Sequence, residues 1–355
     1  MRGRHRALVV AAAVAGMLVF ASAAFATYQP KLVVSSSNGH ARIGVVVGAA
    51  DDPTAKTTIY VPNGYGVATP APGTTLGTVT ATAAALDLGG SVLPLTGALL
   101  AIAPNPSTIA ASQACGVSPT QTWDLHLSAA GQTLDIPLFV VSTIGPEAAS
   151  GFVSKLVVCL PPPDVPVGTP GRSVFGAKLL SATFTSSAIA DPTAKGDYRW
   201  TSLFTPYTPT KGTANAAGTV EVQSVRHLPV ALTAKFTAKR IKVRGKAAKR
   251  ITIRSKATAN GRTEVTSYTT VAGKKRIGAA AGTFTVVGKK PVRVKVTARV
   301  DTSASVPTGT PVSAADLFYR DLGSTGCVPT AIFQGLPCID ATVGGETLVK
   351  VYSVR

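Results

Sequence analysis

The 355-residue sequence predicts an all-β protein made of two or three immunoglobulin-like antiparallel β-sandwich domains, in tandem or with one inserted into another. Two observations support this fold class. Apolar and polar residues alternate in many short runs, and this period of two places successive side chains on opposite faces of a strand. Glycine, proline and asparagine separate the runs, and these residues favour tight turns between strands.

Residues 1–26 have the features of a signal peptide. Three arginines lie within the first six residues, an apolar stretch follows at 7–20, and 24–26 reads Ala-Phe-Ala, a small-x-small cleavage pattern. We therefore expect a mature chain that begins at Thr27 and is secreted or extracellular, with association to the cell wall as one form of this location. An uncleaved anchor is the alternative, since the apolar stretch is long enough to span a bilayer. We expect no transmembrane segment after it.

The cysteines predict two structural disulfides. Their number is four, an even number, which fits an oxidising compartment. Three pairings are possible, and proximity along the chain favours Cys115 with Cys159 and Cys327 with Cys338. Neither pair has the C-x-x-C spacing of a redox or zinc site.

Residues 27–160 predict one β-sandwich domain. Turn signals such as Asn38-Gly39 and Pro72-Gly73 separate its candidate strands. An Ala-rich run at 80–88 is ambiguous, because it also fits a short helix. The candidate strands are Lys31–Val34, Arg42–Val47, Thr57–Val61, Thr78–Thr82, Trp123–Leu127, Leu134–Val141 and Lys155–Cys159.

A proline-rich segment at 161–172 predicts a semi-rigid linker and a domain boundary, because proline cannot donate to a sheet. Beyond it, 173–227 offers three strands and 312–355 offers two. Each piece is too small to bury a core, so we expect them to form one discontinuous domain with 228–311 inserted. Three modules in tandem are the alternative. The five candidate strands are Ala177–Phe184, Asp197–Phe204, Gly218–Val225, Ile339–Val343 and Thr347–Val354.

The stretch 231–300 carries almost all of the net charge. It holds eleven lysines and eight arginines against one acid, Glu264, whereas the whole chain has a formal net charge of +19. Around Ile251 and Val294 the apolar residues share one strand face and the cations share the other. This alternation predicts a basic immunoglobulin-like module at 228–311, a half-buried sheet with a cationic outer face. The cations expected on that face or at its turns are Arg240, Lys242, Arg244, Arg250, Arg254, Lys256, Lys274, Lys275, Lys289, Lys290, Arg293, Lys295 and Arg299.

Two functions fit this charge. The first is binding of an anionic cell-envelope polymer, such as teichoic acid, an acidic polysaccharide or DNA. The second is a structural spacer or assembly unit of the envelope without a specific ligand, whose lysines keep strand edges soluble. Sequence-specific nucleic-acid recognition is not expected, because base stacking needs several aromatic side chains and the stretch has only Phe236, Tyr268 and Phe284.

The segment 277–284, followed by 288–294, resembles the closing hairpin of immunoglobulin-like modules in exported proteins of high-GC bacteria. The resemblance rests on composition and covers about a fifth of the chain. It implies a sandwich fold and an extracellular place. It carries no activity and no functional residue over to this chain.

The sequence contains no catalytic signature, since the H-E-x-x-H, G-x-S-x-G and P-loop patterns are absent. Asp124 and His126 share one strand face and could supply two metal ligands, but no third ligand is apparent. Tyr198 and Trp200 lie in an aromatic cluster that fits the core of the second domain, with a sugar-stacking platform as the alternative. We expect no enzyme activity, no cofactor and no metal site.

Overall fold

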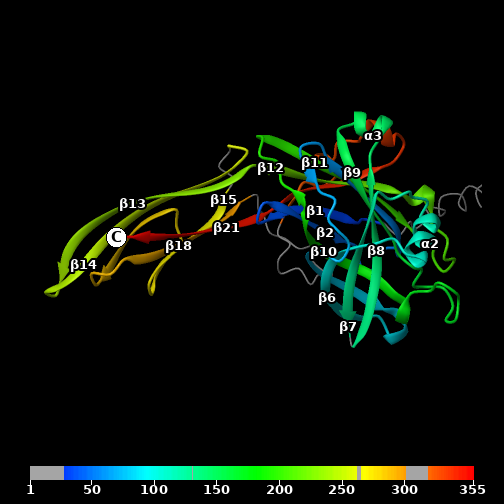
Figure 1. Cartoon of the computed structure of the whole chain (residues 1–355), viewed down its shortest axis with the longest axis horizontal. Coiled ribbons are helices and arrows are strands. Elements are labelled where there is room, and N and C mark those ends of the chain that lie inside the picture. Colours follow the sequence, from blue (N-terminus) through cyan, green and yellow to red (C-terminus); the bar gives the residue numbers. More distant parts are fainter. Residues whose placement is uncertain (1–27, 130, 262–264, 301–318) are drawn as a thin grey trace, which may run out of the picture.

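The structure is a computed structural model, and it describes residues 28–129, 131–261, 265–300 and 319–355. The expected signal peptide at 1–26 lies outside the described residues. Most of the described chain is β-strand, as the sequence predicts. Figure 1 shows two parts, which we call the main lobe and the elongated basic lobe.

Within the described residues, one 14-stranded sheet builds the main lobe. Its order is β1-β2-β10-β5-β6-β7-β8-β9-β3-β11-β12-β20-β19, and β4 pairs with β10. Neighbouring strands are antiparallel except for the parallel pair β12 and β20. The strands are β1 Lys31–Ser37, β2 His40–Val46, β3 Thr54–Pro62, β4 Gly66–Val67, β5 Thr75–Ala85, β6 Ser91–Ile102, β7 Gln121–Ala129, β8 Gln132–Ser142, β9 Phe152–Cys159, β10 Ala177–Ala190, β11 Gly196–Pro206, β12 Val220–Leu228, β19 Tyr319–Asp321 and β20 Cys338–Gly344.

This sheet curls until its two ends meet. The Val34 amide of β1 donates to Ser224 Oγ of β12 at 3.0 Å, and Thr342 Oγ1 of β20 donates to the Leu32 carbonyl at 2.6 Å. Gly344 allows this approach, because a Cβ at that position would lie 1.6 Å from the Val34 carbonyl oxygen. The result is a near-barrel that encloses a single core.

The interior of the curled sheet holds the large apolar side chains. Trp123, Leu138, Trp200 and Phe204 are each 1% exposed or less and belong to one continuous cluster. Burial of side chains this large supplies most of the stabilisation of such a fold. The expected separate sandwiches are therefore replaced, in the main lobe, by one sheet around one core.

The division of the main lobe at the proline-rich segment 161–172 needs correction. Strand β10 pairs with β2 and β5, and β11 pairs with β3, so 173–227 completes the sheet begun by 27–160. Three strands cannot bury a core alone, and the first segment offers the missing neighbours. The segment itself lies on the main lobe, because Arg172 Nη2 pairs with Asp87 Oδ1 at 2.6 Å and Val165 is buried.

Two helices and five 3₁₀ turns complete the described part of the main lobe. Helix α2 begins after Asn105, whose side chain accepts from the Thr108 amide in a capping box. The expected helix alternative at 80–88 is wrong for most of its length, since β5 runs to Ala85. The bounds are α2 Pro106–Ala114, α3 Gly145–Ala149, and the 3₁₀ turns Leu86–Leu88, Val174–Gly176, Ala216–Gly218, Ser324–Gly326 and Ala331–Phe333.

The basic lobe is a small two-sheet sandwich. Its described sheets have the orders β13-β14-β17 and β16-β15-β18-β21. Ile251, Ile253 and Phe284 of the first sheet form one buried cluster with Val294 and Val296 of the second. The strands are β13 Val230–Val243, β14 Lys246–Ala259, β15 Val265–Ala272, β16 Lys275–Ile277, β17 Ala281–Val287, β18 Val292–Val300 and β21 Glu346–Val354.

The path of the chain between the lobes differs from the expected one at the C-terminal end. The chain leaves the main sheet after β12, forms β13 to β18, and re-enters the main sheet with β19 and β20. It then leaves again, and β21 pairs along the whole of β18, with Val296 opposite Lys350. The expected assignment of 347–354 to the second domain is corrected, because β21 pairs with β18 and completes the basic lobe instead.

Both predicted disulfides are confirmed. Cys115 follows α2 and is bonded to Cys159 at the end of β9, and Cys327 is bonded to Cys338 at the start of β20. In the part of the chain that the structure describes, none of the helices has the length and apolar character needed to cross a membrane.

Candidate functional site

The predicted cations of the basic lobe lie at its surface. Twelve of the thirteen are exposed, and Arg299 is half-buried. The described residues of the stretch, 230–261 and 265–300, contain no aspartate or glutamate. The lobe therefore carries its positive charge without acidic residues on its own strands from β13 to β18.

Strand register assigns these cations to faces, because residues directly opposite each other in a sheet share a face. Ile251 and Ile253 point into the core, so their neighbours in β14 point outward. Lys235 and Lys239 of β13 lie opposite Arg254 and Arg250 on that outward side. We call this surface the three-strand face, and its cations are Lys235, Lys239, Arg250, Arg254 and Lys256.

The second sheet presents a separate cationic surface. Val292, Val294 and Val296 of β18 point into the core, so the alternate residues point outward. Arg276 lies on the same side, since it pairs with Val271, which lies opposite Lys295. We call this surface the four-strand face, and its cations are Arg276, Arg293, Lys295 and Arg299.

The expectation of a single cationic face is thus corrected. The two sheets pack through their apolar sides, which places the three-strand and four-strand faces on opposite sides of the lobe. Arg240 and Lys242 lie on neither face. The register pairs them with Lys249 and Ala247, on the side of β13 that carries Leu232. Both are exposed, and they lie next to the hairpin turn at Arg244 and Gly245.

Sequence reasoning missed Lys235 and Lys239, although a local signal for them exists. Arg244 and Gly245 both have positive φ, 48° and 75°, as a two-residue type I′ hairpin turn requires. Counting outward from that turn pairs Val243 with Lys246 and places Lys239 opposite Arg250. The alternation around Ile241 is misleading. Ile241 and Val243 resemble core residues, which would place Arg240 and Lys242 on the outer face, but both apolar side chains are only half-buried.

The three-strand face places like charges directly opposite each other. The Cβ atoms of such a pair lie roughly 4.5–5.5 Å apart, and like charges on directly opposite residues destabilise a sheet. The pairs are Lys235 with Arg254 and Lys239 with Arg250. A polyanion bound across the hairpin would relieve this repulsion.

The neck between the lobes holds a buried ionic cluster. Arg226 of β12 is 0% exposed, and its Nη2 donates to Glu346 Oε2 at 3.0 Å and to Ser36 Oγ at 3.2 Å. Burial raises the pKa of Glu346 to about 7, against the lowering effect of the Arg226 charge. Burial also raises the pKa of Asp191, which is close enough to Arg226 to feel its charge.

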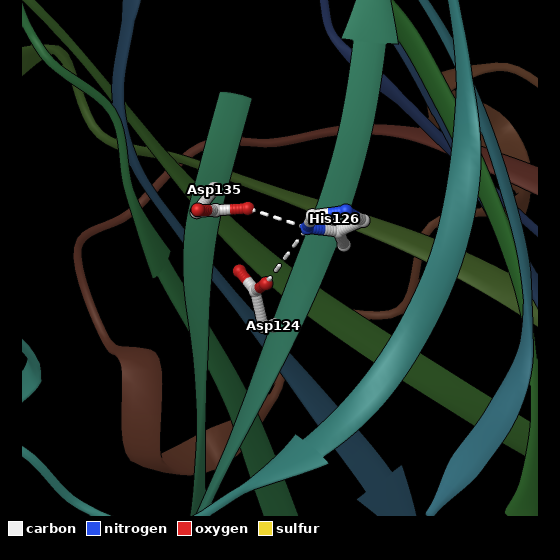
Figure 2. Close-up of side chains that lie close together, drawn as sticks. All are labelled: Asp124, His126 and Asp135. Atoms are coloured by element: carbon white, nitrogen blue, oxygen red, sulfur yellow. Dashed lines mark hydrogen bonds and ion pairs between the residues drawn. The ribbon is translucent and has the colours of Figure 1, made fainter. Parts of the chain in front are cut away.

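A second polar group lies on the outer surface of the main lobe (Figure 2). His126 Nδ1 lies 2.6 Å from Asp135 Oδ1 and 3.7 Å from Asp124 Oδ2. Strand β8 supplies Asp135, the third candidate ligand that the sequence of β7 does not reveal. Burial, followed by the Asp135 charge, raises the pKa of Asp124 to about 6. The three residues could each offer one ligand atom to a metal ion, since those atoms lie within 4.8 Å of one another.

The aromatic cluster belongs to the core. Trp200 and Phe204 are fully buried, and Tyr198 is half-buried against the edge of Tyr65, with ring centroids 5.7 Å apart. A sugar-stacking platform needs exposed ring faces, and Trp200 offers none.

Comparisons with protein-family models, with curated proteins and with solved structures gave no match.

Proposed function

We propose that this chain is a secreted or cell-surface, non-enzymatic β protein whose basic lobe binds an anionic polymer without sequence preference. Teichoic acid, acidic polysaccharide and DNA are the candidate classes of polymer. The observation that carries the proposal is the pairing of like charges on the three-strand face, with Lys239 opposite Arg250 and Lys235 opposite Arg254.

This pairing of like charges distinguishes polyanion binding from a cationic face that serves only solubility. Lysines that only protect strand edges serve that purpose equally well when they face acids or neutral residues. Cations placed opposite each other instead lower the stability of the sheet and strengthen the local positive potential. Exposed cations of this density release counterions from a polyanion on binding, which is a large source of affinity at low salt.

The extracellular location rests on three features. Residues 1–26 have the pattern of a signal peptide, and both cysteine pairs form disulfides, which persist in oxidising compartments. The resemblance of 277–284 and 288–294 to modules of exported bacterial proteins fits the same location. The alternative function is a structural spacer or assembly unit of the cell envelope without a specific ligand.

The test is the salt dependence of binding by the full chain. Teichoic acid, heparin and duplex DNA are titrated between about 50 and 200 mM salt. If about six phosphates are neutralised, the affinity for duplex DNA falls about a thousandfold over that range. The spacer alternative predicts feeble binding to all three polymers at the lowest salt, and that result would overturn the proposal.

A further inference from the structure

A cleft of about 910 Å³ lies where the lobes meet. One wall is formed by β1, β2, β5 and β10 of the main sheet, and the other by the starts of β13 and β21. This volume lies in the upper part of the range for sites that bind small molecules, roughly 300–1,000 Å³.

Hydroxyl groups dominate the lining of this cleft. Nine serine and threonine residues line it, among them Thr80, Thr183 and Thr193. A hydroxyl both donates and accepts hydrogen bonds, so such a wall suits a ligand whose own groups do the same. Leu348, Val349 and Pro229 add apolar surface against which the C–H faces of a sugar ring can pack.

Two polar atoms of the lining lack a protein partner. Ser35 Oγ and Asp191 Oδ1 are buried without a hydrogen-bond partner among the described residues. Both residues line the cleft. Buried polar groups are normally paired, so the residues of this wall leave hydrogen-bonding capacity unused by the protein.

The charge of the cleft is balanced, unlike that of the basic lobe. Asp191 and Glu346 are its acidic lining residues, Arg42 is its basic one, and Arg226 lies buried against Glu346. The two guanidinium groups therefore offset the two carboxyl groups in the charge of the cleft. The cleft suits the uncharged, hydroxylated part of a ligand rather than its charged groups.

The cleft leads onto the four-strand face. Thr347 lines the cleft and lies opposite Arg299 in the sheet. Lys295 and Arg293 follow along β18 on the same side. At about 3.3–3.4 Å per residue, the three cations are spaced at roughly 13 Å and 7 Å. Duplex DNA carries one charge per about 1.7 Å, so this row matches a polymer with sparser charges.

We infer that the polymer is an acidic polysaccharide, which places sugar hydroxyls in the cleft and its acidic groups along Arg299, Lys295 and Arg293. This inference rests on the proposed function, because it names the ligand class of the same lobe. Nucleic acid fits the cleft poorly, since Phe184, its aromatic lining residue, is only 6% exposed and offers no stacking surface.

The test uses the full chain, a hyaluronan oligosaccharide and a polyphosphate of similar length. Hyaluronan carries one carboxylate on every second sugar, whereas polyphosphate is charged but has no sugar hydroxyls. The cleft variant is Thr80→Val with Thr193→Val, two exposed positions, and the control is Thr75→Val with Thr133→Val, two exposed threonines outside the cleft. Valine keeps the shape and the strand preference of threonine.

We expect the cleft variant to weaken hyaluronan binding about tenfold to thirtyfold, as the loss of two ordinary hydrogen bonds implies, and to leave polyphosphate binding unchanged. The control variant leaves both affinities unchanged. An unchanged hyaluronan affinity, or binding of polyphosphate alone, overturns the inference and leaves the proposed function intact. If Arg293→Gln with Lys295→Gln weakens the binding of both polymers, the proposed function is supported whatever the cleft variant shows. Failure of both polymers to bind at low salt contradicts the function as well.

Discussion

The fully buried Arg226 donates to Glu346 at 3.0 Å, and this ion pair joins the last main-sheet strand before the basic lobe to the first residue of β21. Arg226 Nη1 also donates to the Gly344 carbonyl. The Arg226 side chain thus connects two of the segments in which the chain passes between the lobes.

The first prediction concerns removal of this guanidinium. Arg226→Met leaves Glu346 buried without its counter-charge, and breaking a buried pair in this way costs about 3–5 kcal/mol. Glu346→Gln is the milder change, because the amide oxygen still accepts from Arg226. Urea unfolding of both variants checks this, and an Arg226→Met variant as stable as the parent would contradict the structural role of the pair.

The second prediction concerns pH. The pKa of Glu346 is raised from 4.5 to about 7, so the folded chain binds a proton between these values that the unfolded chain has lost. Stability from this group is therefore full below pH 4.5 and falls as pH rises to about 7. Glu346→Gln should remove that decline. Burial also raises the pKa of Asp191, and its charge acts on Glu346, so the difference between the two pH profiles reports Glu346 together with its effect on Asp191.

The third prediction concerns the disulfides. The chain-entropy model gives about 4 kcal/mol for the Cys115–Cys159 loop, with a separation of 44, and about 3 kcal/mol for the Cys327–Cys338 loop, with a separation of 11. Replacing each pair with alanine should therefore destabilise the chain in that order. Thermal unfolding of the two double variants gives the comparison, and a reversed order would show that strain or packing outweighs loop length.

The fourth prediction follows from repulsion on the three-strand face. Lys239→Gln removes a cation opposite Arg250 and should stabilise the chain by about 0.2–1 kcal/mol at low salt. The gain should shrink at high salt, where screening already weakens the repulsion. Lys195→Gln, at an exposed position of the main lobe, is the control. A gain of equal size in the control would assign the effect to net charge alone.

The sequence predicts local features of this fold well, for identifiable reasons. Alternation in β18 identifies the buried valines, because one face of the strand packs in the core and the other is largely exposed. Proximity identifies the disulfides. The curled main sheet was not predictable in the same way, since the pairing of β10 with β2 and β5 joins segments more than ninety residues apart.

The candidate site shows the same limit. Lys242 and Arg240 were assigned to the wrong face because alternation is informative only where one side of the strand is buried. Asp135 was missed as a neighbour of His126 because the hairpin register of β7 and β8, rather than either strand alone, brings them together. The neighbours of an exposed residue depend on which strands pair and in which register. Composition does not reveal that pairing.

The most direct test of the central claim compares two variants of equal charge in duplex-DNA binding across the salt range. Lys239→Gln with Arg250→Gln alters the three-strand face, whereas Lys195→Gln with Lys211→Gln removes two exposed cations from the main lobe. If the face binds the polymer, the first variant loses affinity and its slope of log K against log salt becomes shallower by about 1.8, while the second keeps the parent slope. Equal slopes for the two variants would contradict the account, because binding would then follow net charge and not this face.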